Sequence, residues 1–133
     1  MEDIEHLGIA VEDIEEAVPA YERLLNTSCY KREVVDDQKV ETAFFKTGSS
    51  KVELLAAMRE DSVIAKFIRK EGEGIHHVAF KVEDIVAEME RLKKEGFRVL
   101  SEQPRRGADN KLVAFVHPKD SHGTLIELCQ ETE

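Results

Sequence analysis

Two parts of this chain repeat the same pair of side chains that could bind a metal. The segment HLGIAVEDI begins at His6, and HVAFKVEDI begins at His77. Several dozen residues after each segment, a second short motif recurs in which a glutamate lies between two apolar residues: VEL around Glu53 and IEL around Glu127. Imidazole nitrogens and carboxylate oxygens suit a borderline divalent ion such as cobalt, manganese, nickel or zinc. The repeat therefore predicts two similar modules that pool four ligands, and an enzyme is the leading interpretation.

A structural explanation competes with this one. A single histidine at the start of a strand is commonly only polar, and a single glutamate in an apolar strand commonly faces solvent. The repetition of both residue types in both halves favours a shared metal. The other three histidines lack such a repeat, and we expect them to form hydrogen bonds or line a rim: His76, His117 and His122.

The first repeat lies in a predicted strand with two unlike faces. In residues 5–11, apolar side chains alternate with His6 and small residues. Asp13 then has the position of a helix N-cap, and apolar residues recur at helical spacing behind it. Pro19 conflicts with this helix and should kink it or delay its start. Three further strands are predicted in this half, over residues 29–35, 40–46 and 51–57.

The second half repeats this order. A strand over 76–82 precedes a helix capped by Asp84 and closed by Gly96. We expect a basic loop over 104–110, a connector with a short helix at 59–73, and three more strands at 97–102, 112–116 and 123–130. The predicted fold class is α+β, with one domain over residues 1–133. It consists of two tandem βαβββ modules, at about 3–58 and 74–131, that form a curled mixed sheet around a central metal cleft.

The charge and hydropathy of the chain limit the kinds of partner that it can bind. The net charge of −9 argues against nucleic acid, because phosphate backbones require a basic surface. No apolar run approaches the roughly 20 residues of a membrane helix, and the acidic start at Glu2 is unlike a signal peptide. We therefore expect a cytoplasmic protein without membrane contact, in which Cys29 and Cys129 are reduced.

These segments resemble the vicinal oxygen chelate superfamily, the glyoxalase, bleomycin resistance and dioxygenase group, over essentially the whole chain. Within it they resemble most the methylmalonyl-coenzyme A epimerase family. That narrower resemblance depends on SVIAKF from Ser62, GEGIHHVAF from Gly72, and HPK from His117 ahead of GTLIEL. The resemblance implies an isomerase of propionate metabolism that interconverts (2R)- and (2S)-methylmalonyl-CoA by removing the α-proton through a metal-stabilised enolate.

The resemblance also implies roles for individual residues. The ligands fall on the four residues of the repeat, and Glu127 becomes the first candidate for proton transfer. Some members carry a second glutamate base where this chain has Thr42, with Glu41 beside it. Adjacent strand residues point to opposite faces. Either a bulge or a register shift aims Glu41 at the cleft, where it is the weaker candidate base for the opposite face of the substrate, or a different second base serves.

The coenzyme A thioester would need positive charge for its phosphates. The basic residues nearest to the cleft-forming segments are Lys119, Arg105 and Arg106, although ordinary surface residues would look the same. The family implies a homodimer. Two alternatives stay open: a glyoxalase I-like lactoylglutathione lyase with the same metal chemistry, and a metal-free small-molecule binding protein of the resistance type.

Overall fold

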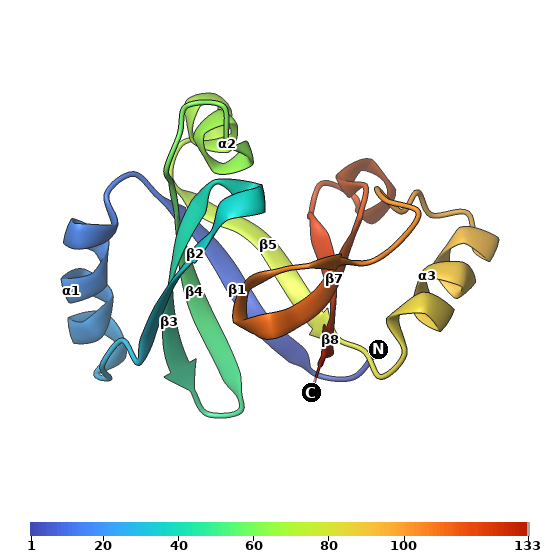
Figure 1. The fold of residues 1–133 in the computed structure, drawn as a ribbon, viewed down its shortest axis with the longest axis horizontal. Helices are drawn as coiled ribbons and strands as arrows, with labels where there is room; N and C mark the ends of the chain where they lie inside the picture. Colours follow the sequence, from blue (N-terminus) through green and yellow to red (C-terminus); the bar gives the residue numbers. More distant parts are fainter. Residues whose placement is uncertain (133) are drawn as a thin grey trace. The chain divides into compact units, whose positions relative to one another are not determined.

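The computed structural model describes residues 1–132, which divide into two compact units (Figure 1). The N-terminal unit is His6–His76, and the C-terminal unit combines Met1–Glu5 with residues 77–132. In chain order the elements are β-α-β-β-β, a helix, and β-α-β-β-β again. The two units are defined by contacts between residues in space. The predicted module boundaries are defined by the repeat in the sequence, and they stay a prediction.

The N-terminal unit contains a sheet with the strand order β2-β3-β4-β1. The strands β1 and β4 are parallel, and the other neighbours are antiparallel. One face of this sheet packs against α1 through an apolar cluster that includes Ile14, Phe45 and Leu54. The bounds of the elements are β1 (Ile4–Val11), α1 (Ile14–Leu25), β2 (Lys31–Val35), β3 (Val40–Thr47), β4 (Ser50–Ala57) and α2 (Val63–Glu71).

The helix α1 begins where its cap predicts. The carboxylate of Asp13 accepts a hydrogen bond from the backbone N–H of Glu15 at 2.9 Å. Asn26 ends the helix in the left-handed conformation, with φ of 53°. Pro19 lies inside the helix without delaying its start. The exposed side of α1 tolerates the lost hydrogen bond, because water can reach the free carbonyl.

The opposite face of the N-terminal sheet packs against α2. Ser62 caps this helix by accepting a hydrogen bond from the N–H of Ala65 at 3.1 Å. Ile64 then inserts into a second apolar cluster with Ala10 and Leu55. The two faces of one sheet are therefore covered by different helices, and the α2 face is the one that also carries His6.

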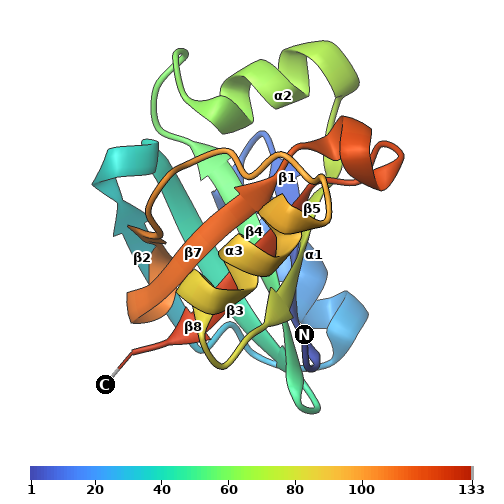
Figure 2. The same ribbon diagram turned by 90° about the vertical axis from the view of Figure 1, so that its right-hand side faces the viewer.

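The C-terminal unit contains a sheet with the order β5-β8-β7-β6, and α3 lies against β7 and β8 (Figure 2). The prediction of a strand over 97–102 is wrong. That segment forms one isolated bridge, between Val99 and Val116, because Phe97 and Val99 turn inward to pack under α3. The edge strand is a two-residue piece of the predicted loop. The bounds are β5 (Gly74–Lys81), α3 (Ile85–Lys94), β6 (Arg105–Arg106), β7 (Lys111–Val116) and β8 (Ile126–Glu131).

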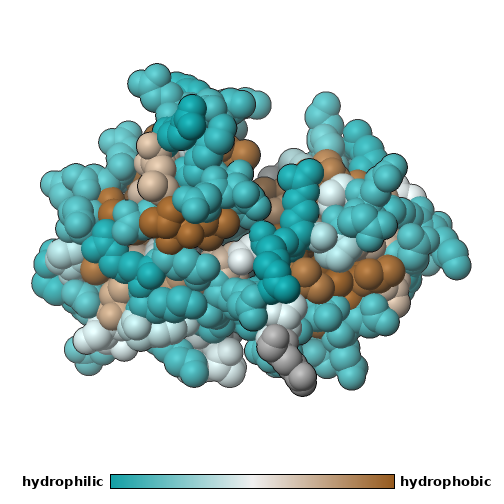
Figure 3. All heavy atoms as spheres, in the orientation of Figure 1, coloured by the Kyte–Doolittle hydropathy of each residue, from teal (hydrophilic) through white to brown (hydrophobic). Residues whose placement is uncertain are grey.

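The face of the molecule drawn in Figure 3 is mostly hydrophilic. Figure 3 shows charged and polar residues over most of one face, with apolar atoms exposed in small separate areas. Within residues 1–132, no helix is long and apolar enough to cross a membrane. Both cysteines are free, as predicted, with Cys129 buried and Cys29 partly exposed.

Candidate metal centre

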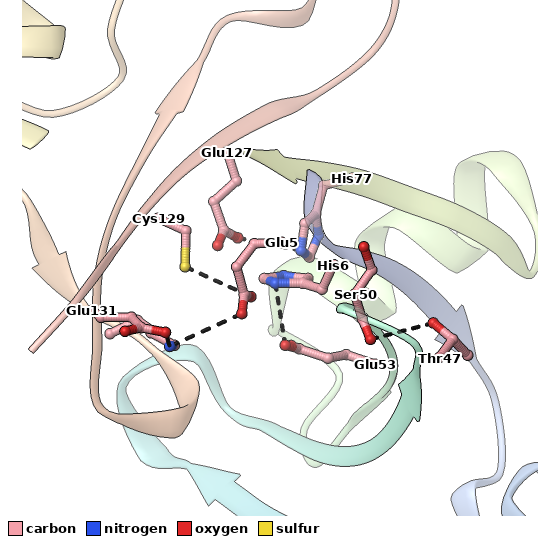
Figure 4. A network of polar contacts seen from close by, with 10 residues as sticks. Glu5, His6, Thr47, Ser50, Glu53, His77, Glu127, Cys129 and Glu131 are labelled. Carbon is pink, nitrogen blue, oxygen red and sulfur yellow. Dashed lines mark hydrogen bonds and ion pairs between the residues drawn. The ribbon is translucent and has the colours of Figure 1, made fainter. Parts of the chain in front are cut away.

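The N-terminal unit brings His6 and Glu53 together. Gly8 is the register partner of Glu53 on the parallel strands β1 and β4, so His6, two residues earlier, shares the face of Glu53. Nδ1 of His6 lies 3.2 Å from Oε2 of Glu53. Figure 4 shows this contact as a dashed line. The side chains are only 5% and 6% exposed, so the pair is nearly closed to water.

The C-terminal unit repeats this arrangement. Ala79 of β5 is the register partner of Glu127 of β8, and His77 lies two residues before Ala79. Nε2 of His77 is 3.2 Å from Oε1 of Glu127, and both side chains are 6% exposed. The ring of Phe115 meets that of His77 edge-on, with 5.9 Å between the ring centroids. Packing of this kind fixes the plane of the imidazole.

The donor chemistry of both pairs fits a borderline divalent ion. A carboxylate buried without a partner costs roughly several kcal/mol, so such groups are rarely kept without a purpose. Here each unit buries a glutamate carboxylate that has an imidazole nitrogen beside it, Glu53 with His6 and Glu127 with His77. An imidazole and a carboxylate per unit are the N and O donors that Zn²⁺, Co²⁺, Ni²⁺ and Mn²⁺ accept.

The neighbours of the two glutamates also repeat. Glu53 lies between Gly8 on one side and Phe44 on the other, and Glu127 lies between Ala79 and Phe115. The small residues leave room beside each carboxylate, and the aromatic rings form an apolar wall. Sequence reasoning did not single out the two phenylalanines. The signal that could have found them is the hairpin register, since each occupies the strand before its glutamate.

Glu41 lies on the other face of the N-terminal sheet. The register between β3 and β4 runs without a bulge from Val40–Ala57 to Thr47–Ser50, and it places Glu41 opposite Ala56 on the α1 side. This corrects the expectation that Glu41 could reach the face of Glu53. The reason is strand alternation: Thr42 takes the place on the Glu53 face.

The carboxylate of Glu41 is held there by an arginine. Arg32 donates to Oε2 of Glu41 from Nε at 3.1 Å and from Nη2 at 2.8 Å. Its Nη1 donates to Oε1 of Glu15, in α1, at 2.7 Å. These hydrogen bonds to Glu15 and Glu41 raise the pKa of the Arg32 guanidinium above its usual value. The cluster joins β2 and β3 to α1 and leaves Glu41 with a structural role.

We expect Glu41→Gln to leave kcat within about twofold of the unaltered protein, because the side chain faces α1. The loss of an exposed ion pair should lower the free energy of unfolding by less than about 1 kcal/mol. Steady-state kinetics and urea unfolding measure both quantities. A fall in kcat of more than tenfold, with metal retained, would restore Glu41 as a base.

The predicted basic residues separate in the structure. Arg105 pairs with Val113, which shares its face with Phe115, so Arg105 lies on the Glu127 face. Arg106 points to the α3 side, where its guanidinium donates to Oδ1 of Asn110. Both arginines are exposed at the edge of the sheet.

The HPK segment forms a short turn beside β7. Lys119 is exposed in the 3-10 turn Pro118–Ser121, and its backbone N–H donates to Nδ1 of His117 at 3.1 Å. Arg98 anchors this turn by donating three hydrogen bonds to Asp120. The side-chain hydrogen bond from Arg98 is the main reason that the pKa of Asp120 lies below its usual range.

The remaining histidines have other surroundings. His76 stacks edge-on against Phe67 of α2, with 4.9 Å between the ring centroids. Burial there lowers the pKa of His76 to about 4, so it is neutral at physiological pH. His122 ends the Pro118–Ser121 turn in the left-handed conformation and is exposed. The expectation was that these histidines form hydrogen bonds or line a rim; the hydrogen bond to the ring of His117 agrees with it, whereas the packing of His76 against Phe67 was not predicted.

Comparison with known proteins identifies the family. A model of the Glyoxalase/Bleomycin resistance protein/Dioxygenase superfamily matches residues 5–115. The ethylmalonyl-CoA/methylmalonyl-CoA epimerase of Cereibacter sphaeroides is 42% identical over 96% of this chain and 96% of its own length. The human mitochondrial methylmalonyl-CoA epimerase is 38% identical over 96% of this chain and 73% of its own length.

A solved structure gives the same result. A variant of the Streptomyces coelicolor methylmalonyl-CoA epimerase, in complex with 2-nitronate-propionyl-CoA, matches with a TM-score of 0.95 and 37% identity. The match covers 99% of this chain and 96% of that one. The predicted fold class of two βαβββ modules is thereby confirmed. The chain belongs to the glyoxalase, bleomycin resistance protein and dioxygenase superfamily, and its relatives include proteins named methylmalonyl-CoA epimerase.

Proposed function

We propose that this protein is a metal-dependent epimerase that interconverts (2R)- and (2S)-methylmalonyl-CoA. The observation that carries the proposal is the buried histidine–glutamate pair, which occurs once in each unit. Relatives that carry the epimerase name, at 38–42% identity over nearly the whole chain, support the choice of substrate. We propose that His6, Glu53, His77 and Glu127 together are the ligands of one divalent ion.

The reaction makes a specific demand on the protein. The α-carbon of the substrate lies between a thioester carbonyl and a carboxylate, so loss of its proton places negative charge mainly on the thioester oxygen. A bound divalent ion would supply Lewis-acid stabilisation of that charge. The protein must then remove the α-proton on one face and return a proton on the other.

We assign the first proton transfer to Glu127. Its carboxylate is buried, with the ring of Phe115 as an apolar wall on one side and room beside the small side chain of Ala79 on the other. A carboxylate in this position can take up the α-proton from one face of the substrate, and it returns a proton to that same face when the reaction runs in reverse. Glu41 does not serve as its counterpart, because Arg32 holds it on the α1 side.

The deciding experiment is exchange of the α-proton in heavy water. Protein loaded with Co²⁺ is incubated with one epimer of methylmalonyl-CoA in D₂O, and NMR follows both the α-proton and the ratio of epimers. We expect deuterium incorporation together with loss of stereochemical purity. Neither change, with metal bound, would contradict the proposal, and a hemithioacetal assay would then test the lyase alternative. Failure to bind metal after reconstitution would favour the binding-protein alternative.

We propose that Arg105 contributes to binding the coenzyme A phosphates and that Arg106 does not. Only Arg105 lies on the sheet face of Glu127, whereas Arg106 is turned toward α3 and bonded to Asn110. We expect Arg105→Ala to raise KM by about three- to tenfold with kcat unchanged, as loss of one exposed phosphate contact would. Arg106→Ala is the matched control, and equal effects of the two substitutions would contradict this assignment.

The contribution of Lys119 to phosphate binding, the homodimer and the cytoplasmic location stay predictions. The identity of the ion, among cobalt, manganese, nickel and zinc, is also a prediction. Multi-angle light scattering measures the oligomeric state. Elemental analysis of protein purified without added metal identifies the ion that it retains.

A further inference from the structure

Thr42 carries a buried hydroxyl that no protein group satisfies. Its side chain is fully buried, and its Oγ1 is the one buried side-chain polar atom within residues 1–132 that has no hydrogen-bond partner. Burying a hydroxyl without a partner is unfavourable, and native proteins keep few such groups. A valine has the same shape without this cost, so the hydroxyl needs an explanation.

The register places this hydroxyl beside the N-terminal histidine–glutamate pair. Thr42 is two residues before Phe44, and Phe44 is directly opposite Glu53 on the antiparallel strands β3 and β4. Thr42 is therefore the diagonal neighbour of Glu53 on the same face of the sheet. Such diagonal positions lie about 7–8 Å apart, which a long side chain such as glutamate can span.

The other neighbours of Thr42 do not provide a hydrogen-bond acceptor for its hydroxyl. Along β3 it lies between Val40 and Phe44, and Leu55 is opposite on β4, all of them buried and apolar. Glu33 is opposite on the edge strand β2, where Lys31 pairs with it at 3.3 Å. The apolar neighbours cannot accept a hydrogen bond, and the partly exposed Glu33 is paired with Lys31, so Glu53 is the buried carboxylate nearest to the hydroxyl in the register.

Metal binding would change what Glu53 requires. Its Oε2 now contacts Nδ1 of His6 at 3.2 Å. An ion that takes lone pairs from both groups replaces this contact, and the carboxylate then needs another donor to fix its orientation. Hydrogen bonds to ligating carboxylates commonly serve this purpose, and losing one typically weakens metal binding by about 10- to 100-fold.

We propose that Thr42 is a positioning residue whose hydroxyl donates a hydrogen bond to Glu53 when that carboxylate binds the metal. This inference rests on the proposed function, since it requires Glu53 to be a ligand. It explains why a polar residue occupies a position with apolar neighbours along its strand: the buried hydroxyl gains an acceptor when Glu53 binds the metal.

The test is titration of Co²⁺ into metal-free protein, followed by the visible absorption of the ion. We expect Thr42→Val to raise the Kd for Co²⁺ by about tenfold or more, and Thr42→Ser to stay within about threefold of the unaltered protein. The matched control is Thr47→Val, on the same strand but the opposite face, where the hydroxyl donates to the carbonyl of Ser50 (Figure 4). Its Kd should not change.

Thermal unfolding of the metal-free variants gives an independent readout. Thr42→Val removes an unsatisfied hydroxyl, so we expect its Tm to rise by about 2–5 °C while its metal affinity falls. A purely structural threonine would not move these two quantities in opposite directions. A fall in the metal-free Tm would overturn the inference, as would an unchanged Kd or equal losses in Thr42→Val and Thr42→Ser.

Glu53→Ala separates this inference from the proposed function. If the unaltered protein binds Co²⁺ and Glu53→Ala weakens binding more than about 100-fold, Glu53 is a ligand, and the result for Thr42→Val decides the inference alone. If Glu53→Ala binds Co²⁺ as the unaltered protein does, the proposed ligand set is wrong, and the role of Thr42 falls with it.

Discussion

Glu127→Gln should reduce epimerisation by about 10³-fold or more in kcat. Glutamine keeps the volume and one oxygen of the side chain, so packing between Ala79 and Phe115 should survive. It cannot take up the α-proton, and general-base catalysis is worth about 10²–10⁴-fold. Glutamine also lacks the negative charge of the ligand, which weakens metal binding. We therefore expect the loss of kcat to lie toward the upper end of that range. Steady-state kinetics at saturating Co²⁺ measures the turnover.

Glu131→Gln is the control for that substitution. Glu131 lies on the same strand, β8, but its carboxylate is exposed and pairs with Lys111 at 3.2 Å rather than with a histidine. We expect its kcat to remain within about twofold. Turnover of Glu127→Gln above about a tenth of the unaltered rate would remove Glu127 from the role of proton carrier.

Substitution of either buried histidine should abolish metal-dependent activity. We expect His6→Ala and His77→Ala each to weaken Co²⁺ binding by more than about 100-fold, because each removes the nitrogen donor that lies 3.2 Å from a buried glutamate. Removal of the ion from the unaltered protein with a chelator should abolish turnover, and added Co²⁺ should restore it. Isothermal titration and the exchange assay measure the two effects.

Two other histidines provide matched controls. The ring of His117 accepts the backbone N–H of Lys119, and His122 is exposed at the end of the same turn. Alanine at either position should leave the Co²⁺ affinity unchanged. Equal losses at all four histidines would mean that the ion binds nonspecifically, and turnover that survives chelation would contradict a metal-dependent reaction.

Much of the fold could be predicted from local patterns. Strand alternation around His6 and His77 set which side chains share a face, because successive strand residues point to opposite sides. Cap residues fixed helix starts for the same local reason: Asp13 and Asp84 each accept a backbone N–H in the first turn. The prediction failed for the segment 97–102. Its β-prone residues pack under α3 and form one isolated bridge instead of a strand.

The candidate site was only partly readable. The repeat identified the two histidines and the two glutamates, since their types and order recur in both halves. The sequence left open whether a bulge could turn Glu41 toward Glu53, because bulges leave no reliable mark in one strand alone. The continuous β3–β4 register decided this, and it placed Thr42 on the Glu53 face.

The sequence by itself determined the residue types available for metal chemistry, because they are written in it. It also determined the repeated modules and the helix caps, since alternation and capping depend on residues only a few positions apart. Only the tertiary structure decided which residues are neighbours across strands: Phe44 and Phe115 beside the glutamates, and Arg105 rather than Arg106 on the Glu127 face. The physical reason is that alternation has a period of two, so it assigns faces within a strand. The register between strands depends on turn geometry and on side-chain packing over the whole sheet.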